Sequence, residues 1–423
     1  MKKLFAVCLF FAVAGHLDAK GIFTNPGTRA ASLGGAYTGI ADDLTAIYWN
    51  PAGLAQLEGS GSEVSLVYSA SPAKANTAPT NDGSPDSTNG SFPIPESAFS
   101  GGEPDFNERE LDIKAVLPFA GIYENRNGFV RAFGVYASGG GGGIWEDGSV
   151  PNLYASLSSK YAYIVTNFTV AKKISNRLSV GGGLNIVNMF DKLFVEKKWS
   201  GGAPYTATID KNSYGYGFEI TAGAMYELNS RLQLGAVIRS GAKIKLDGSA
   251  TVTHSIPAYA AALGGVSEYT QEYHYPMTAG VGASYNVNKK MLVTGGIDFN
   301  RYSRMKDDTT YDTPSGILTS GSNNDGWVNT YQIRGGVEYA ASGRLAYRFG
   351  FYTDPAPNDR SKLTLFNTNQ YDWIPVTLGV GYDFGRTKID FCYAHTFSDQ
   401  PSSGTREYEY AVDSVRFSTA YKF

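Results

Sequence analysis

The chain has 423 residues, a formal net charge of −3 and a charged fraction of 18%. This near-neutral balance gives no support for nucleic-acid binding, which needs a strongly basic surface. The 50 glycines, 29 tyrosines and 23 phenylalanines are instead typical of the strands and aromatic girdles of membrane β-barrels.

The amino-terminal residues have the composition of an export signal. Lys2 and Lys3 precede an apolar run from Leu4 to Ala14, and small residues up to Ala19 offer a cleavage site. The run is too short to cross a bilayer as a helix. We therefore predict a signal peptide over residues 1–19. Its removal leaves Cys392 as the remaining cysteine, so no intramolecular disulfide is expected.

Residues 20–62 show no strand-like alternation. Short helical pieces and glycine breaks follow one another, and Asp42 and Asp43 can cap a short helix that Pro51 ends. A segment of this size cannot bury enough surface to fold alone. Because a barrel of about fourteen strands is wide enough to need filling, we predict that residues 20–62 form a small helical hatch inside it.

From residue 63 onward, apolar and polar residues alternate in segments with the period of a β-strand. The last segment ends with Tyr421 and Phe423 on its apolar face and Lys422 on its polar face. The predicted strands cover 63–71, 110–123, 128–138, 160–172, 177–197, 212–227, 231–252, 268–287, 290–304, 327–340, 343–353, 371–384, 387–397 and 406–423.

The connections between these segments are alternately short and long. Turns such as Asn125–Gly128 carry the Asn and Gly that tight hairpins favour, whereas the opposite connections, 253–267 and 305–326 among them, are long and polar. Outer-membrane barrels have short periplasmic turns and long outer loops. The fold class is therefore an all-β membrane protein: an antiparallel transmembrane barrel of about 14 strands over residues 63–423, in the outer membrane, with both termini periplasmic. The terminal Phe423 would contact the barrel-assembly machinery.

The predicted hatch carries the residues that resemble a known family. Gly34 and Gly35 lie in the run G-T-R-A-A-S-L-G-G-A-Y, and Asp42 and Asp43 open the run A-D-D-L-T-A-I-Y-W-N-P-A-G-L-A. These runs resemble the hatch of FadL-type outer-membrane transporters, whose Asn-Pro-Ala motif falls on Asn50, Pro51 and Ala52. The resemblance implies uptake of long-chain fatty acids or related hydrocarbons. No cofactor is expected.

The resemblance also implies a bent third strand that leaves a lateral gap in the barrel wall. Phe133 to Ser138 match that strand, and a run of glycines follows. Glycines weaken strand pairing and permit bulges, although a flexible loop base is the alternative from the residues alone. The candidates for the kink and gap are Ser138, Gly139, Gly140, Gly141, Gly142 and Gly143.

Several cations fall on the predicted lumen face. They are Arg239, Lys243, Lys245, Arg334, Arg348 and Arg416. Arg334, Arg348 and Arg416 lie near mid-depth and could meet a fatty-acid carboxylate. The preferred interpretation is structural ion pairs between barrel and hatch, with partners drawn from Asp42, Asp43, Asp298, Glu338, Asp383 and Asp390.

Other functions remain as alternatives. Enzyme activity is not expected: His254 falls in a predicted loop, His274 on the lumen face and His395 among outward aromatics, with no catalytic constellation or metal-ligand spacing. A general diffusion porin conflicts with the predicted plug. A plugged barrel that acts as a binding or assembly subunit of a secretion system is not separated from uptake by the sequence. The expected partners are a hydrophobic small molecule, outer-membrane lipid and lipopolysaccharide, and the protein is expected to be a monomer.

Overall fold

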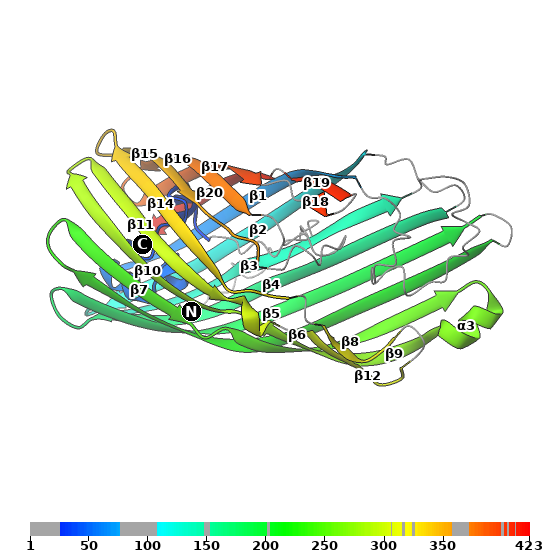
Figure 1. The fold of residues 1–423 in the computed structure, drawn as a ribbon. Coiled ribbons are helices and arrows are strands. Elements are labelled where there is room, and N and C mark those ends of the chain that lie inside the picture. The colour runs from blue at the N-terminus through cyan, green and yellow to red at the C-terminus, as the bar shows by residue number, and fades with distance from the viewer. Residues whose placement is uncertain are drawn as a thin grey trace.

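The computed structural model describes residues 26–76, 108–147, 153–200, 204–305, 307–314, 318–323, 326–357, 372–398, 402–403, 406–410 and 412–423. The predicted signal peptide and residues 20–25 of the predicted hatch lie outside these ranges. The described chain forms a closed antiparallel barrel of 14 wall crossings, with residues 26–57 inside it (Figure 1). The predicted fold class is confirmed.

Sixteen strands build the wall, because two of the crossings are each split into two strands. They are β1 (Ser60–Asn76), β2 (Glu108–Arg126), β3 (Phe129–Asp147), β4 (Leu153–Lys173), β5 (Leu178–Trp199), β6 (Tyr205–Glu227), β7 (Leu232–Arg239), β8 (Ala242–His254), β9 (Gly265–Tyr275), β10 (Met277–Asn288), β11 (Met291–Arg301), β14 (Thr330–Ala340), β15 (Leu345–Tyr352), β16 (Trp373–Asp383), β17 (Thr387–Ser398) and β20 (Val412–Lys422).

Shorter elements complete the described chain. They are helices α1 (Thr28–Ser32), α2 (Ala46–Trp49), η1 (Pro51–Gln56), α3 (Pro257–Leu263) and η3 (Tyr302–Arg304), and strands β12 (Asp307–Tyr311), β13 (Gly321–Asn323), β18 (Ser402–Ser403) and β19 (Arg406–Tyr410). Helix α3 lies in the connection predicted over 253–267, and β12 and β13 lie in that predicted over 305–326. No helix among the described residues is long and apolar enough to cross a membrane.

The barrel closes between its first and last strands. β1 pairs with β20 in an antiparallel ladder that runs from Gly61 opposite Lys422 to Ala70 opposite Asp413. Closure leaves no free edge at this seam, as a membrane requires of a spanning sheet. The carboxyl terminus lies at the end with the short turns, called here the short-turn end (Figure 1).

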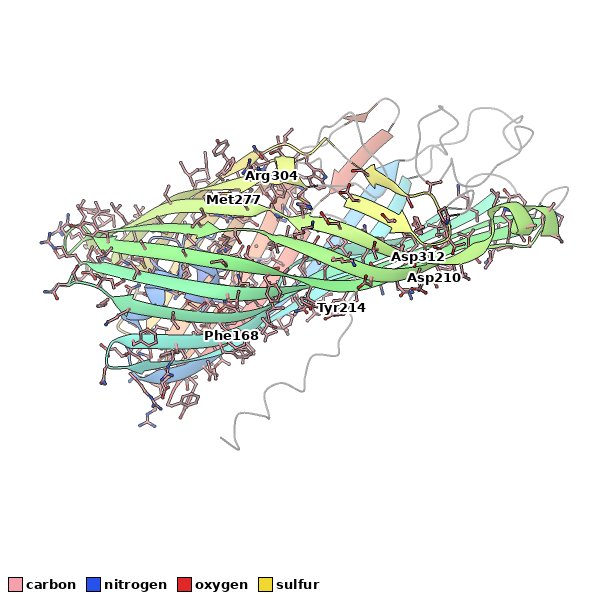
Figure 2. All side chains as sticks on the ribbon, turned by 90° about the horizontal axis from the view of Figure 1, so that it is seen from below. Phe168, Asp210, Tyr214, Met277, Arg304 and Asp312 are labelled. Carbon is pink, nitrogen blue, oxygen red and sulfur yellow. The ribbon has the colours of Figure 1, made fainter. Side chains whose placement is uncertain are left out.

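Side chains alternate between lumen and exterior along each strand. On β6, Glu219 and Thr221 are 3% and 1% exposed, whereas Phe218 and Ile220 are 59% and 64% exposed. Phe168 and Tyr214 lie on the wall, and Asp210 and Asp312 lie further from the short-turn end (Figure 2). This exposed apolar exterior is the surface that lipid covers in a transmembrane barrel.

The seventh crossing contains an irregularity that the sequence did not reveal. Thr221 pairs with Arg239, but Tyr216 pairs with Lys245, so one extra residue is inserted at Ser240–Gly241, where Gly241 has φ +69°. A one-residue shift exchanges the two faces of a strand. The predicted lumen positions of Lys243 and Lys245 are therefore wrong: both are exposed, while Ile244 between them is buried.

Two histidine predictions are also wrong. His274 on β9 is the cross-strand partner of Lys243 and so shares its outer face. His254 ends β8 rather than lying in a loop, and its ring stacks on Tyr205 at 5.5 Å. His395 lies on the outer face of β17, as predicted, with Nδ1 2.9 Å from Asp413 Oδ1.

The wall is much taller on one side than on the other. Strands β3 to β6 have 19 to 23 residues, whereas β15 has 8. The long strands project together beyond the rest of the barrel, and α3, which connects β8 with β9, lies at the same end (Figure 1). We call this the long-strand end.

Candidate functional site

Residues 26–57, called here the hatch, lie within the barrel near the short-turn end (Figure 1). Its apolar side chains are almost fully buried; Leu33, Tyr37, Ile47 and Leu54 are all 0% exposed. Wall hydroxyls hold its backbone: Thr377 Oγ1 donates to Ser32 O at 3.1 Å, and Ser284 Oγ donates to Gly39 O at 2.9 Å. The hatch is thus packed and hydrogen-bonded across the lumen.

Gly34 and Gly35 turn the hatch chain where it touches the wall. Their φ angles are +64° and +68°, which favour glycine. A Cβ on Gly34 would lie 2.3 Å from Phe351 O, and one on Gly35 would lie 2.6 Å from Arg334 Nη1. The pair of glycines therefore serves both the turn and the close approach of the hatch to β15 and to Arg334 of β14.

The Asn50–Pro51–Ala52 motif connects the hatch with the wall. Asn50 precedes η1, and its Oδ1 accepts from Ala52 N at 3.2 Å, while Pro51 occupies the first helical position. Asn50 Nδ2 donates to Thr38 O at 2.9 Å and to Ala224 O, on β6, at 3.1 Å. One amide therefore caps a helix, joins two hatch segments and anchors both to the barrel.

We expect Asn50→Ala to weaken hatch docking by about 2–3 kcal/mol, because one cap and two largely buried hydrogen bonds are lost. Asn50→Asp keeps the cap acceptor but buries a carboxylate against Thr38 O and Ala224 O, so it should weaken hatch docking more than Asn50→Ala. Hydrogen exchange of hatch peptides should therefore rank protection as wild type, then Asn50→Ala, then Asn50→Asp. Equal protection in all three proteins would contradict this role.

An ion-pair network joins the hatch to three wall strands. Arg29 Nε lies 2.8 Å from Glu338 Oε2 on β14, and that same carboxylate oxygen lies 2.6 Å from Arg348 Nε on β15. Arg348 Nη1 lies 2.5 Å from Asp390 Oδ1 on β17. Glu338 therefore bridges one hatch arginine and one wall arginine.

The two hatch carboxylates have different environments. Asp42 pairs with Arg29, and Tyr37 OH lies 2.9 Å from Asp42 Oδ1 and 2.7 Å from Asp43 Oδ2. Burial alone would raise the pKa of Asp42, but attraction to Arg29 and hydrogen bonds from Tyr37 and Arg29 lower it. Burial and then repulsion by Asp42 raise the pKa of Asp43. Asp43 Oδ1 accepts from Thr45 N at 2.9 Å at the start of α2.

The other two candidate lumen cations are also buried. Arg334 Nε lies 2.6 Å from Asp298 Oδ2, and its Nη1 donates to Gly34 O at 3.3 Å. Its guanidinium also lies 5.5 Å from the ring centroid of Trp49 in the hatch. Arg416 is 9% exposed and stands opposite Cys392 on β17. For Arg334 and Arg348, these acidic partners favour the structural interpretation over capture of a substrate carboxylate.

A small cavity of about 40 Å³ lies between the hatch and the lumen wall. The hatch contributes Tyr48 and Trp49, and the wall contributes Tyr136 and Ser138 of β3 and Arg239 of β7, among others. The Tyr48 ring packs edge-on against the Tyr136 ring, with centroids 5.8 Å apart. The Arg239 guanidinium lies 4.0 Å from the centroid of the same Tyr48 ring. The hatch thus touches the third strand through an aromatic pair.

Pairing between β2 and β3 is incomplete. Its ladder runs from Arg126 opposite Phe129 to Phe119 opposite Tyr136 and ends there in the described chain, although β2 continues along β1 to Glu108 and β3 continues along β4 to Asp147. The wall therefore has an opening between these two strands on the long-strand side of Tyr136, called here the β2/β3 opening.

Pro118 marks the same place on β2. Proline has no N–H to donate and is normally found on strands that lack a partner on one side. Pro118 directly precedes Phe119, the β2 residue at which the β2–β3 ladder ends on its long-strand side. Pro118 falls within the strand predicted over 110–123, so a proline inside that strand was the available sequence signal for the interruption.

Ser138 is the extra residue at which β3 changes register against β4. Ala137 pairs with Ile164 and Gly139 pairs with Tyr163, so Ser138 is skipped. Ser138 is 1% exposed and its Oγ accepts from Tyr275 OH at 3.3 Å. Gly139, Gly140, Gly141, Gly142 and Gly143 pair with Tyr163 to Ser159, so this run is a strand along β4 rather than a loop base.

A groove of about 910 Å³ lies at the β2/β3 opening. Its apolar lining comes largely from outward-facing positions of neighbouring strands, including Pro118, Val135, Ile164, Phe190 and Tyr214. Tyr136 lines both this groove and the lumen cavity. Tyr136 therefore lies between the lumen cavity and the groove.

The described residues contain no group of three or more His, Cys, Asp or Glu placed to hold a metal ion.

Comparison with protein families assigns the chain. Residues 11–421 match the model described as outer membrane protein transport protein (OMPP1/FadL/TodX). The chain belongs to this family. The resemblance inferred from the hatch motif is confirmed, and the protein is an outer-membrane barrel of the FadL type. A search of curated proteins finds no significant match.

Solved structures of this family share the fold. A Pseudomonas aeruginosa FadL homologue matches with a TM-score of 0.75 at 15% identity, over 97% of this chain and 100% of that one. The Pseudomonas putida toluene transporter TodX matches with 0.68 at 14% identity, over 97% and 100%. The Ralstonia pickettii toluene transporter TbuX matches with 0.66 at 14% identity, over 94% and 98%. At these identities the likeness shows the fold alone.

Proposed function

We propose that this FadL-type barrel takes up hydrophobic molecules, long-chain fatty acids or hydrocarbons, and releases them sideways through the β2/β3 opening. The observation that carries the proposal is the end of the β2–β3 ladder at Phe119 and Tyr136, beside a largely apolar groove. An apolar molecule that leaves there enters lipid without crossing water, so its transfer stays favourable.

The proposal includes a role for the hatch. Tyr48 of α2 packs on Tyr136, and Tyr136 stacks on Phe119 with centroids 6.1 Å apart. A shift of α2 would remove the support behind Tyr136 and connect the lumen cavity with the groove. A substrate drives such a shift only if it binds the shifted hatch more tightly than the resting one.

The proposed orientation places the short-turn end and both termini in the periplasm and the long-strand end outside the cell. Outer-membrane barrels have short periplasmic turns and long outer loops, and the tall wall of β3 to β6 fits the outer side.

The two competing functions, a diffusion porin and a secretion scaffold, require a different lumen or a different wall. A diffusion porin needs an open lumen, whereas the buried hatch is held by Asn50 and the Arg29–Glu338 pair. A plugged scaffold for a secretion system needs no interruption in its wall. The β2/β3 opening therefore supports transport over both.

Uptake of labelled oleate and labelled toluene by cells with and without the protein tests the proposal. We expect the protein to accelerate entry of at least one of the two, and Asn50→Ala to alter that rate because it loosens the hatch. Planar-bilayer recordings should lack a large steady conductance. Entry of both labels at the rate of cells without the protein would overturn the proposal, and a large steady conductance would favour the porin.

A further inference from the structure

Two lysines face each other on the outer wall at one margin of the groove. Lys160 on β4 and Lys192 on β5 are direct cross-strand partners, and both line the groove. Both share the strand face of outward residues: Phe168 on β4 is 51% exposed and Phe190 on β5 is 49% exposed. Directly opposed like charges destabilise a strand pair, so this arrangement favours an anion between them.

The neighbours in the ladder supply no such anion. Lys160 is flanked on its other side by Gly142 of β3, and Lys192 is flanked by Asn212 of β6. Two carboxylates line the groove elsewhere. Asp247 lies two strands away from Lys192, and its Oδ1 is 3.8 Å from Lys245 Nζ. Asp191 is two residues from the buried Met189 on β5, so it lies on the lumen face of the strand.

The depth of the pair matches the headgroups of the outer leaflet. Lys160 lies 13 residues before Lys173, where β4 ends at its short turn. At about 3.3 Å per residue and a tilt near 40°, this is about 33 Å above the turn, beyond an apolar band of about 25 Å. Phe190 and Tyr214, with ring centroids 4.8 Å apart, lie just below the pair, at the level where barrels have an aromatic girdle.

Below the two amines, the groove offers a floor for an acyl chain. Ala162, Ile164 and Phe190 lie directly beneath them, and Val135 and Pro118 continue the floor to the β2/β3 opening. The groove is therefore amphipathic along its length, with paired cations at the headgroup level and apolar side chains below.

We propose that this groove is a binding site for a phosphorylated glycolipid of the outer leaflet, lipopolysaccharide. One phosphate bridges Lys160 and Lys192, and one acyl chain lies along the floor and covers the β2/β3 opening. This inference rests on the proposed function for its orientation in the membrane, and it adds a lipid partner at the exit. A departing substrate then exchanges with an acyl chain, and water is kept from the opening between transport events.

The charge of the pair favours phosphate over the carboxylate of a departing fatty acid. A phosphate monoester carries close to two negative charges and three acceptor oxygens, which matches two ammonium groups on adjacent strands. A carboxylate has one charge. Lysine is a compact point charge well suited to phosphate.

Native mass spectrometry of the purified full chain in detergent tests the site. The probes are lipid A with two phosphates and the same lipid without phosphate. Wild type should bind the phosphorylated form, and K160Q/K192Q should bind it roughly 30-fold more weakly, as expected for two lysines at a charged lipid surface. The variant should bind the dephosphorylated form as wild type does.

K243Q is the matched control, because Lys243 is an outward cation that already pairs with Glu272 at 2.6 Å. It should bind like wild type, and K160R/K192R should retain binding. Equal lipid A binding by wild type and K160Q/K192Q would overturn the proposal. The proposal would also be overturned if K160Q/K192Q lost oleate binding but kept lipid A binding. The lysine pair would then bind the carboxylate of a departing fatty acid. Because lipid binding is measured without uptake, failure of the site and failure of the proposed transport function are distinguishable.

Discussion

Glu338→Ala should release the hatch from the wall while the barrel stays folded. The substitution leaves Arg29 and Arg348, which are 18% and 6% exposed as side chains, without the carboxylate that bridges them. Leaving a buried charge uncompensated costs about 3–5 kcal/mol, but Arg29 keeps Asp42 and Arg348 keeps Asp390, so the cost should lie below that range. Hydrogen exchange should show lost protection in peptides from residues 26–57.

Asp383→Ala is the matched control for that experiment. Asp383 pairs with Lys388 at 3.7 Å, and their side chains are 39% and 54% exposed. Exposed pairs of this kind contribute about 0–1 kcal/mol, so hatch protection should be unchanged. Unaltered protection in Glu338→Ala as well would show that the ion-pair network does not hold the hatch.

Sealing the wall should abolish uptake without disturbing the hatch. Deletion of Ser138 would make the β3–β4 register continuous, and Pro118→Val would restore an N–H to β2 at the point where the β2–β3 ladder ends. Together the two changes should let this ladder extend toward the long-strand end. If release is lateral, uptake of labelled substrate should fall to the level of cells without the protein.

The control removes a comparable residue elsewhere. Val287 is the extra residue between Asn286 and Asn288 where β10 meets β11, at a short turn and distant in the barrel from the β2/β3 opening. Its deletion should leave uptake near the wild-type rate, and both variants should keep their hatch protection. Undiminished uptake in the sealed variant would exclude the β2/β3 opening as the exit.

The fold was largely predictable because its signals are local. Alternation on a strand such as β14, where Tyr331 is 62% exposed and Gln332 is 7% exposed, follows from residue type alone. The hatch motif was equally informative, since Asn50 and Pro51 have local roles at the start of η1. Such features need no knowledge of distant contacts.

The predictions that were wrong depend on the register between neighbouring strands. Lys243 and Lys245 keep their alternation in the sequence, but the extra residue at Ser240–Gly241 moves them to the outer face. Similarly, the end of the β2–β3 ladder depends on where two strands diverge. A period-two pattern contains the alternation and not its phase relative to a neighbour, so these positions required the structure.

The pairing of β1 with β20 has a consequence for biogenesis. The seam joins Gly61 to Lys422, so β20 must find β1 across more than 300 intervening residues of sequence. Docking of the hatch also depends on strands late in the sequence, since Ser32 and Leu33 pack against β16 and β15. Such non-local contacts are slow to form. Until the barrel closes, its first and last strands would present two unpaired edges to other nascent chains.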